Sequence, residues 1–347
     1  MTFAILHEPA SYTVDRNHFV YDKLGIRYVY MHGESEAKSG ETAQEKPLGT
    51  LSFFQLTKRL CQILRDNDKI IMNGYNGKIF LLLFFLNYFY RRSIGLDSDT
   101  QLVIPAQPLK RMVKYLYLHW VFTNRHIYGL AGGTQTHKEL FRHYGMPESH
   151  IFLMPMTVNN AKFRCPTPRP EKPFRFLYVG RIIAIKNIEM MIDAFAETFS
   201  NDENVELQIV GRGELLESLR KRYSAASNIH FAGPKYGDEL IAEYHHAHAL
   251  ILPSTEEPWG LVVNEAMAAG MPVIASTEVG ARYDLVIENE TGFVFDPHDK
   301  TQLGTHMRHL AQNPALYRKM AENAAHKLND EWNYEFYEEC LRKFLIS

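Results

Sequence analysis

The stretch ILPSTEEPWGLVVNEAMAAGMPVIAS, residues 251–276, places two glutamates around a short loop that leads into a helix. Its apolar start is typical of a buried strand, Gly260 interrupts the chain, and the following apolar positions keep helical spacing to Gly270. A helix that begins directly after a strand presents free backbone N–H groups and a positive dipole end, so this segment predicts an anion site. Glu257 lies in the loop and Glu265 lies about one helical turn further along.

A second element upstream supplies basic residues. FRFLYVGRIIAIKNIEMMIDAF, residues 174–195, has the pattern of a strand, a glycine, a short loop and an amphipathic helix. Arg181 and Lys186 fall in that loop, at the carboxyl end of the strand, where open α/β sheets bind ligands. Each element taken alone also fits a solvated basic loop or an acid that favours a helix start. Together they favour a ligand with a phosphate between two hydroxyl-bearing ends, such as a nucleotide sugar.

The segment 174–296 resembles the nucleotide-binding domain of retaining glycosyltransferases with the GT-B fold, specifically glycosyltransferase family four (glycosyl transferases group 1). The matching pieces are VGRIIAIKN, LQIVGRG, IHFAGP, ALILPSTEEPWGLVVNEAMAAGMPVIAS and GARYDLVIENETGFVF, in the family's order and spacing. The resemblance implies the α/β class, with two facing Rossmann-like domains and a donor cleft between them. About a third of the chain carries the strong part of this resemblance.

The resemblance also implies roles for individual residues. Arg181 and Lys186 are expected to bind the donor diphosphate, Glu257 the donor sugar and Glu265 the ribose, with Arg181, Lys186 and Glu257 as the catalytic set. The full expected donor-binding set is Gly180, Arg181, Lys186, Gly211, Gly213, Pro234, Lys235, Glu257, Gly260, Leu261, Val262 and Glu265. Neither a metal nor a cofactor is expected, and a UDP-sugar is favoured over a GDP-sugar as donor.

The length of 347 residues suits two domains of ordinary size. The proline-rich segment CPTPRPEKP, residues 165–173, predicts the boundary between them. We therefore expect an acceptor-binding domain over 1–165, a nucleotide-sugar-binding domain over 166–330, and a C-terminal helix over 331–347 that packs back on the first domain.

The N-terminal half has the pattern of a second α/β domain. Its predicted strands are Phe3–His7, Arg27–Met31, Lys69–Met72, Leu102–Ala106, Ile127–Ala131 and Ile151–Met154. This half departs from the family, because HEPASYTVDRN replaces the glycine-rich loop after the first strand and IPAQPLK lacks the histidine expected after the fourth. His7, Asn76 and Gln107 are the candidate acceptor-side residues. His32 is an alternative, and a structural role is the competing reading of both histidines.

Charge divides the chain. Residues 1–165 hold 20 Lys and Arg against 13 Asp and Glu, and the remainder holds 18 against 27. A basic half favours an anionic partner, and residues 109–129 combine Lys110, Arg111 and Lys114 with apolar positions at helical spacing. This pattern fits either contact with an anionic membrane surface or an ordinary helix with its apolar face in the core. Nucleic acid is not expected, because no recognition signature accompanies the charge.

The remaining sequence signals concern location and metal binding. The three cysteines are widely spaced and lack metal-ligand spacing, and the N-terminus lacks the pattern of a signal peptide, so we expect a cytoplasmic protein, either free or peripheral at the inner face of the membrane. His245, His246 and His248 resemble a metal cluster, but only two of them share a helical face, which favours surface histidines.

The sequence therefore predicts a retaining, metal-independent glycosyltransferase that moves a hexose-type sugar from a nucleotide diphosphate to a glycan or lipid-linked saccharide in cell-surface polysaccharide or glycoconjugate assembly. Two alternatives stay open. A sugar-nucleotide epimerase or hydrolase of the same fold would act on the donor alone. A non-catalytic sugar-binding relative would keep the donor residues without transfer.

Overall fold

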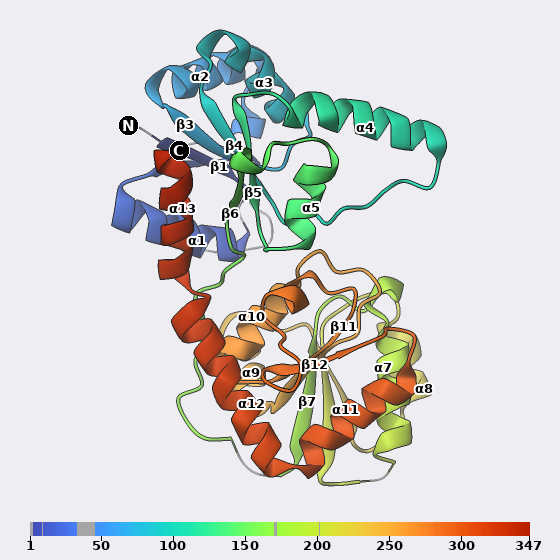
Figure 1. Cartoon of the computed structure of the whole chain (residues 1–347). Coiled ribbons are helices and arrows are strands. Elements are labelled where there is room, and N and C mark those ends of the chain that lie inside the picture. The colour runs from blue at the N-terminus through green and yellow to red at the C-terminus, as the bar shows by residue number, and fades with distance from the viewer. Residues whose placement is uncertain (1–2, 9, 33–45, 170–171, 201) are drawn as a thin grey trace. The chain divides into compact units, whose positions relative to one another are not determined.

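The computed structural model describes residues 3–8, 10–32, 46–169, 172–200 and 202–347. The chain forms two compact units, of which unit 1 holds Met1–Thr157 and Tyr334–Ser347 and unit 2 holds Val158–Asn333. Each unit has one six-stranded sheet, and every strand pairing in both sheets is parallel (Figure 1). The predicted α/β class with two Rossmann-like parts is confirmed.

The sheet of unit 1 has the strand order β2-β1-β3-β4-β5-β6. Its elements are β1 Phe3–His7, α1 Ser11–Leu24, β2 Arg27–Tyr30, α2 Phe53–Asp66, β3 Lys69–Asn73, α3 Lys78–Tyr90, β4 Ser93–Ser98, α4 Pro108–Phe122, β5 Ile127–Ala131, α5 Thr136–His143, β6 Ile151–Leu153 and α13 Tyr334–Ile346. The chain order reverses between β1 and β3, and such a switch point opens a crevice at the carboxyl ends of the strands.

The sheet of unit 2 has the strand order β12-β11-β10-β7-β8-β9. Its elements are α6 Asn160–Phe163, β7 Phe174–Val179, α7 Ile188–Thr198, β8 Val205–Val210, α8 Leu216–Arg222, β9 Ile229–Gly233, α9 Gly237–His246, β10 Ala249–Leu252, α10 Leu261–Ala268, β11 Val273–Ser276, β12 Gly292–Phe295, α11 Lys300–Gln312 and α12 Pro314–His326. The switch point of this sheet lies between β7 and β10, the two strands that precede the basic loop and the glutamate loop.

The fourth strand of unit 1 is not where the sequence predicted it. The prediction at Leu102–Ala106 was wrong, since this segment is irregular and β4 is formed by Ser93–Ser98. The apolar pattern did not predict a strand over Ser93–Ser98, because Gly95 interrupts it. The reason for this glycine is tertiary: a Cβ there would lie 2.6 Å from Leu130 Cδ1 and 3.0 Å from the Phe344 ring.

The C-terminal helix α13 belongs to unit 1 although it follows unit 2 in the chain. The Lys69 ammonium, at the start of β3, donates to the carbonyl of Phe344 at 2.5 Å. Tyr337, Leu341 and Phe344 are buried with Ile5, Ile71 and Leu130 in one apolar cluster. The helix thus covers one face of the first sheet.

The change of unit comes earlier in the chain than the predicted boundary at residues 165 and 166. The division falls after Thr157, because the short helix α6 already packs against α9 and α10 of unit 2. Within the proline-rich segment, Arg169 donates to the carbonyls of Tyr244 at 3.1 Å and Ala269 at 2.6 Å. This contact fixes that part of the segment to unit 2.

Candidate functional site

The carboxyl ends of β7 and β10 hold the residues that the sequence singled out in unit 2. Lys186 follows β7 and Glu257 follows β10, and the Lys186 ammonium donates to the Glu257 Oε2 atom at 2.6 Å. Lys186 is only 7% exposed, whereas Arg181 in the same loop is exposed. Two residues 71 positions apart in the chain therefore form one charged pair at the switch point of the sheet.

The loop that carries Glu257 is fixed by backbone contacts on two sides. The Thr255 N–H donates to the Ile185 carbonyl at 2.9 Å, which ties this loop to the basic loop. The Gly280 N–H donates to the Glu257 carbonyl at 3.0 Å. Tyr178, at the end of β7, donates its hydroxyl to the Arg181 carbonyl at 2.8 Å. Burial raises the pKa of Tyr178, and the Glu257 carboxylate adds to this effect, so the hydroxyl stays protonated.

The Gly-x-Gly element after β8 has a steric cause. A Cβ at Gly211 would lie 1.8 Å from the Gly180 carbonyl oxygen, and one at Gly213 would lie 2.2 Å from the Ile182 carbonyl oxygen. The Ile182 N–H donates to the Arg212 carbonyl at 2.9 Å. The β8 loop therefore packs backbone to backbone against the basic loop, and glycine is the residue that permits this approach.

Helix α10 begins at the glutamate loop. Its N-cap, Gly260, has φ of 90°, a left-handed conformation that favours glycine. The first N–H groups of any α-helix lack intrahelical acceptors, so Leu261 and Val262 present donors beside Glu257. The predicted order of loop, glycine and helix is confirmed.

Glu265 lies in α10. Tyr244 donates its hydroxyl to the Glu265 Oε2 atom at 2.5 Å, which leaves the second carboxylate oxygen for another donor. Burial raises the pKa of Glu265 to about 7, and the hydrogen bond from Tyr244 acts in the opposite direction. The carboxyl group is therefore poised to change charge near neutral pH.

Pro234 and Lys235 follow β9, the strand at the edge of the sheet. Lys235 lies 3.8 Å from Glu239, one helical turn further along. All the predicted donor residues thus lie at or just beyond the carboxyl ends of β7 to β10 or in the first turns of α10. Direct contacts join the loops after β7, β8 and β10.

The histidines near α9 have separate structural contacts. His245 contacts the Phe163 carbonyl through Nε2 at 3.0 Å. His248 is buried, stacks on Phe174 and accepts from the Arg175 N–H through Nδ1 at 3.0 Å. The prediction of surface histidines is wrong for His248. Among the described residues, no group of three or more His, Cys, Asp or Glu side chains could hold a metal ion.

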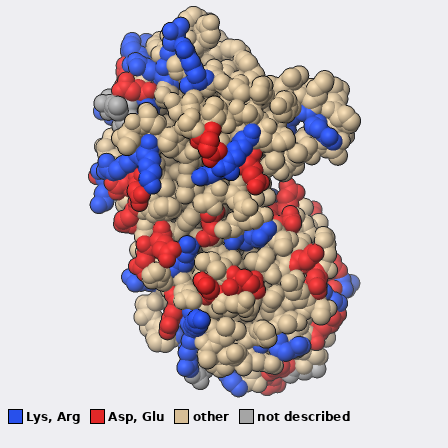
Figure 2. Space-filling model, viewed as in Figure 1, with Lys and Arg blue, Asp and Glu red and all other residues tan. Residues whose placement is uncertain are grey.

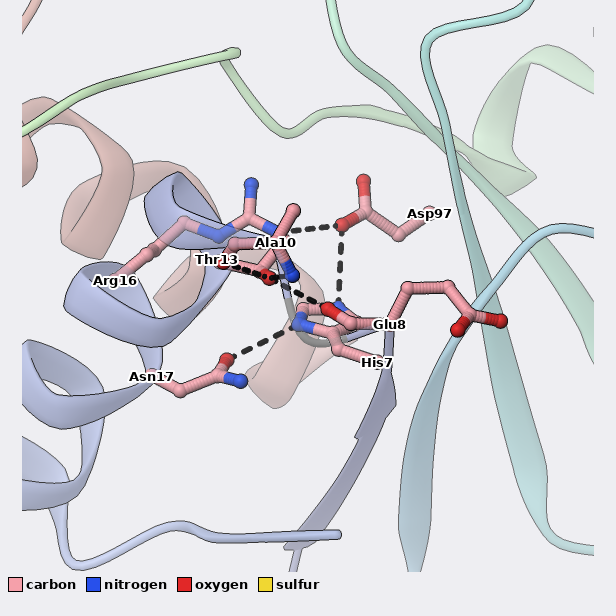
Figure 3. A network of polar contacts seen from close by, with 7 residues as sticks. All are labelled: His7, Glu8, Ala10, Thr13, Arg16, Asn17 and Asp97. Atoms are coloured by element: carbon pink, nitrogen blue, oxygen red, sulfur yellow. Dashed lines mark hydrogen bonds and ion pairs between the residues drawn. The ribbon is translucent and has the colours of Figure 1, made fainter. Parts of the chain in front are cut away.

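The corresponding edge of unit 1 carries a buried polar network instead (Figure 3). The His7 ring contacts Asn17 Oδ1 through Nδ1 at 3.0 Å, and its Nε2 atom lies 3.3 Å from Asp97 Oδ2. Arg16 donates to the same Asp97 oxygen at 3.0 Å. Figure 3 shows the side chains from α1 and β4 converging on His7 at the end of β1. All four residues are buried.

Burial and charge set the protonation states of this network. Burial lowers the pKa of His7, although the contact with Asp97 acts in the opposite direction. Burial alone would raise the pKa of Asp97, but Arg16 and His7 lower it overall. The network therefore holds one ion pair, between Arg16 and Asp97, beside a neutral imidazole. His7, Arg16 and Asn17 of this network belong to the segment HEPASYTVDRN, where the sequence departs from the glycine-rich loop of the family.

His7 is fully buried with Asn17 and Asp97 of its own unit, as in the structural reading of this histidine, and its acceptor-side role stays a prediction. Gln107 is exposed, but it directly precedes α4, makes no side-chain capping hydrogen bond there, and does not follow a strand. The residue that follows β4 is Asp99, which the misplaced strand had hidden. Burial raises the pKa of Asp99, and His137 acts against this shift.

Asn76 lies where the sequence placed it, in the loop after β3. This loop lines a cavity of about 780 Å³ at the switch point of the first sheet. Glu8 and His32, at the ends of β1 and β2, line it too, and their side chains form an exposed pair at 2.7 Å. The apolar floor includes Leu48 and Phe80. Unit 1 thus offers a polar rim over an apolar floor.

Comparison with known families identifies unit 2. Residues 159–327 match the model of the family described as "Glycosyl transferases group 1". This part of the chain is a group 1 glycosyltransferase domain. The resemblance to family-four glycosyltransferases is confirmed for the segment that carries Arg181, Lys186, Glu257 and Glu265.

Curated relatives match the chain over a little more than half its length. A D-inositol 3-phosphate glycosyltransferase of Streptomyces bingchenggensis is 29% identical over 218 residues, which cover 57% of this chain and 48% of the relative. A glycogen synthase of Mycobacterium tuberculosis is 29% identical over 202 residues, with the same coverage. The sulfoquinovosyl transferase SQD2 of Arabidopsis thaliana is 28% identical over 207 residues, covering 59% and 39%. The chain spans about half the length of the first two.

Solved structures match both units. Anabaena Alr3699/HepE in complex with UDP has a TM-score of 0.78 at 16% identity and covers 99% of both chains. The lipopolysaccharide outer core galactosyltransferase WaaB has a TM-score of 0.72 at 16% identity and covers 99% of this chain and 100% of its own. At this identity the likeness concerns the fold, and it extends the GT-B fold class to the N-terminal half.

Proposed function

We propose that this protein is a retaining glycosyltransferase that moves a hexose-type sugar from a nucleotide diphosphate to a glycan or lipid-linked saccharide. The observation that carries the proposal is the Lys186–Glu257 pair at the switch point of the group 1 domain. It lies beside exposed Arg181 and the start of α10, so positive groups converge where an anionic diphosphate would bind.

In this proposal, Lys186 and Arg181 stabilise the charge that develops on the diphosphate as it leaves. An ammonium has three N–H donors, and its contact with Glu257 takes one of them. Preorganised positive charge in a site with little water lowers the barrier for departure of a phosphate group without a metal. The N–H groups of Gly260, Leu261 and Val262 add to it, and Gly180, Gly211 and Gly213 keep the loops close enough for this arrangement.

Glu257 and Glu265 orient the two ends of the donor. The Lys186 contact fixes the Glu257 carboxylate, which then accepts from the sugar hydroxyls near the reacting carbon. Glu265 accepts from the ribose hydroxyls. As the bond from the anomeric carbon to the phosphate oxygen breaks, the acceptor oxygen bonds to that carbon on the same face. The leaving phosphate takes the acceptor proton.

The structures of HepE with UDP and with UDP-glucose support a uridine nucleotide as the first donor to test. The WaaB likeness supports a saccharide acceptor of the cell surface, and we propose a role in polysaccharide or glycoconjugate assembly at the cytoplasmic face of a membrane. In unit 1, the cavity that Asn76, Glu8 and His32 line is the proposed acceptor site.

The test begins with thermal unfolding in the presence of a panel of nucleotide sugars, followed by transfer assays with lipid-linked and soluble saccharides. We expect a UDP-sugar to raise Tm, transfer to proceed in the presence of a chelator, and the product to keep the donor's anomeric configuration by NMR. Release of free sugar or its isomer without an acceptor would indicate the epimerase or hydrolase alternative. Donor binding without any turnover would indicate a non-catalytic relative.

A further inference from the structure

Unit 1 carries a broad exposed apolar surface on two neighbouring helices, α3 and α4, which we call the α3–α4 surface. Its main side chains are Phe85, Tyr88, Phe89, Leu109, Leu116 and Trp120. Phe89 is 81% exposed, Tyr88 78% and Leu109 68%. The sequence left open whether the apolar positions of α4 face the core. The structure answers this, because these positions are exposed in unit 1, and Figure 1 shows α4 projecting from the body of the unit.

The two helices form one continuous surface. The Trp120 ring of α4 lies 4.8 Å from the Phe84 ring and 5.9 Å from the Phe85 ring of α3. Beside this contact is an open cavity of about 500 Å³, which Phe85, Tyr88 and Trp120 line on the apolar side. Contiguous apolar area of this kind marks an interaction site in soluble proteins.

The same surface carries basic groups. Arg91 and Arg125 line the cavity together with His126, and no Asp or Glu is among its lining residues in the described part of the chain. The Arg125 Nε atom donates to His126 Nε2 at 3.2 Å. Burial lowers the pKa of His126, and Arg125 and Arg91 lower it further, so His126 is neutral and the positive charge of this region comes from Arg91 and Arg125.

Acidic residues are nearly missing from this part of the sequence. Between Lys69 and Lys138 the only acidic residues are Asp97 and Asp99, at the end of β4. Figure 2 shows the projecting part of unit 1, in the upper right, as tan and blue. An apolar surface that carries basic groups, with no Asp or Glu among the described residues that line its cavity, is complementary to an anionic leaflet.

We propose that the α3–α4 surface docks onto an anionic lipid bilayer, with the aromatic side chains in the interface and Arg91 and Arg125 on lipid phosphate groups. A second copy of the chain is disfavoured as the occupant, since a symmetric contact would bring like charges together. The inference deepens the proposed membrane location and rests on it, whereas donor binding by unit 2 does not depend on it.

The structure also changes which basic residues test this idea. Arg111 donates to the Pro105 carbonyl at 3.2 Å, and Lys114 donates to the Val103 carbonyl at 2.7 Å. These two residues hold the loop before α4, so their removal would disturb the surface itself. Arg91 and Arg125 are the sharper positions for substitution.

The experiment is co-sedimentation of the full chain with vesicles of phosphatidylcholine alone and of phosphatidylcholine mixed with phosphatidylglycerol. We expect binding only to the mixed vesicles, weakening as salt rises. Because each basic residue at an anionic surface contributes about fivefold, the double variant Arg91→Gln/Arg125→Gln should bind about 25-fold more weakly. Tyr88→Ser/Phe89→Ser should lose roughly tenfold or more, and both changes are at exposed positions that the core does not need.

The matched controls remove the same groups elsewhere. Lys221→Gln/Lys319→Gln removes two exposed charges from unit 2, and Ile287→Ser/Ile346→Ser removes two exposed apolar side chains. Both should bind vesicles as wild type does. Equal losses in the controls, or wild type that stays in solution with mixed vesicles at low salt, would overturn the proposal.

Light scattering, which measures the oligomeric state, tests whether a second copy of the chain occupies the α3–α4 surface. A wild-type dimer that Tyr88→Ser/Phe89→Ser converts to a monomer would assign the surface to a second copy and overturn the membrane assignment. Donor binding, measured in the same preparations by thermal shift with UDP-sugars, reports separately on the proposed transfer function. A loss of vesicle binding with intact donor binding would therefore overturn only the membrane proposal. A loss of donor binding with intact vesicle binding would overturn only the transfer proposal.

Discussion

The first strands of the two sheets end in opposite ways. β1 ends at His7, which is buried with Asn17, Arg16 and Asp97, whereas β7 leads to Gly180 and an exposed Arg181. In unit 1 all the charged groups of this network are buried, whereas in unit 2 the buried Lys186 pairs with Glu257 and Arg181 of the same loop is exposed. Equivalent places in two similar folds therefore hold an enclosed polar network in one unit and the proposed donor site in the other.

The largest expected effect tests the structural role of the unit 1 network. Asp97→Ala leaves the buried Arg16 guanidinium without its carboxylate partner, and breaking a buried ion pair costs about 3–5 kcal/mol. Urea unfolding followed by circular dichroism should show this loss. Glu8→Ala is the control, because its pair with His32 is exposed and should contribute below about 1 kcal/mol. If both variants lose only a small and equal free energy of unfolding, the buried network does not stabilise unit 1 as proposed.

The next effect tests the unit 2 edge. Lys186→Ala should raise the barrier to transfer by about 2–4 kcal/mol, because the variant lacks one positive charge that stabilises the leaving diphosphate. This corresponds to a fall in kcat of roughly 30-fold to 900-fold. Lys221→Ala, at an exposed position on α8, should keep wild-type kcat. A Lys186→Ala enzyme with unchanged turnover at saturating donor, and with intact circular dichroism, contradicts the assignment.

Substitution of the two glutamates of the site should affect the affinity for two different ligands, the free nucleoside diphosphate for Glu265 and the sugar nucleotide for Glu257. Glu265→Gln keeps an acceptor for Tyr244 but loses the charged acceptor for ribose, so free nucleoside diphosphate should bind more weakly by roughly 1–3 kcal/mol. Glu257→Gln should weaken the sugar nucleotide and leave the free diphosphate nearly unaffected. Calorimetry with both ligands measures this. Equal losses for both ligands at Glu257 would show that the sugar is misplaced.

The smallest effect follows from the pKa of Glu265, which burial raises to about 7. Ribose hydroxyls that donate to the carboxylate favour its ionised form, so below pH 7 binding must release a proton. Affinity for a UDP-sugar should therefore rise with pH from 6 to 8, by less than about tenfold per pH unit. The sugar nucleotide is the right probe, since its diphosphate does not titrate in this window. A slope that persists in Glu265→Gln belongs to another group.

The sequence pattern gave a wrong prediction for the fourth strand, where residues distant in the chain determine which side chain fits. Gly95 is glycine because Leu130 and Phe344 occupy the space of a side chain, so β4 lost its apolar pattern and the strand was placed too late. That error made Gln107, and not Asp99, the residue expected directly after the fourth strand. The change of unit precedes the predicted boundary for a similar reason, because packing of α6 and the contacts of Arg169 attach the described part of this segment to unit 2.

The sequence by itself determined the two segments of the proposed donor site, residues 174–195 and 251–276. In each segment a strand, a loop with a glycine and a helix follow one another closely, and the signals for them are local spacing, turn chemistry and charge. It also determined five of the six strands in the sheet of unit 1. Among the described residues, no helix is long and apolar enough to cross a membrane. The tertiary structure alone decided that Lys186 meets Glu257, that His7 is buried, and that the apolar positions of α4 are exposed on unit 1. These outcomes depend on which distant segments pack together, and neither spacing nor composition encodes that choice locally.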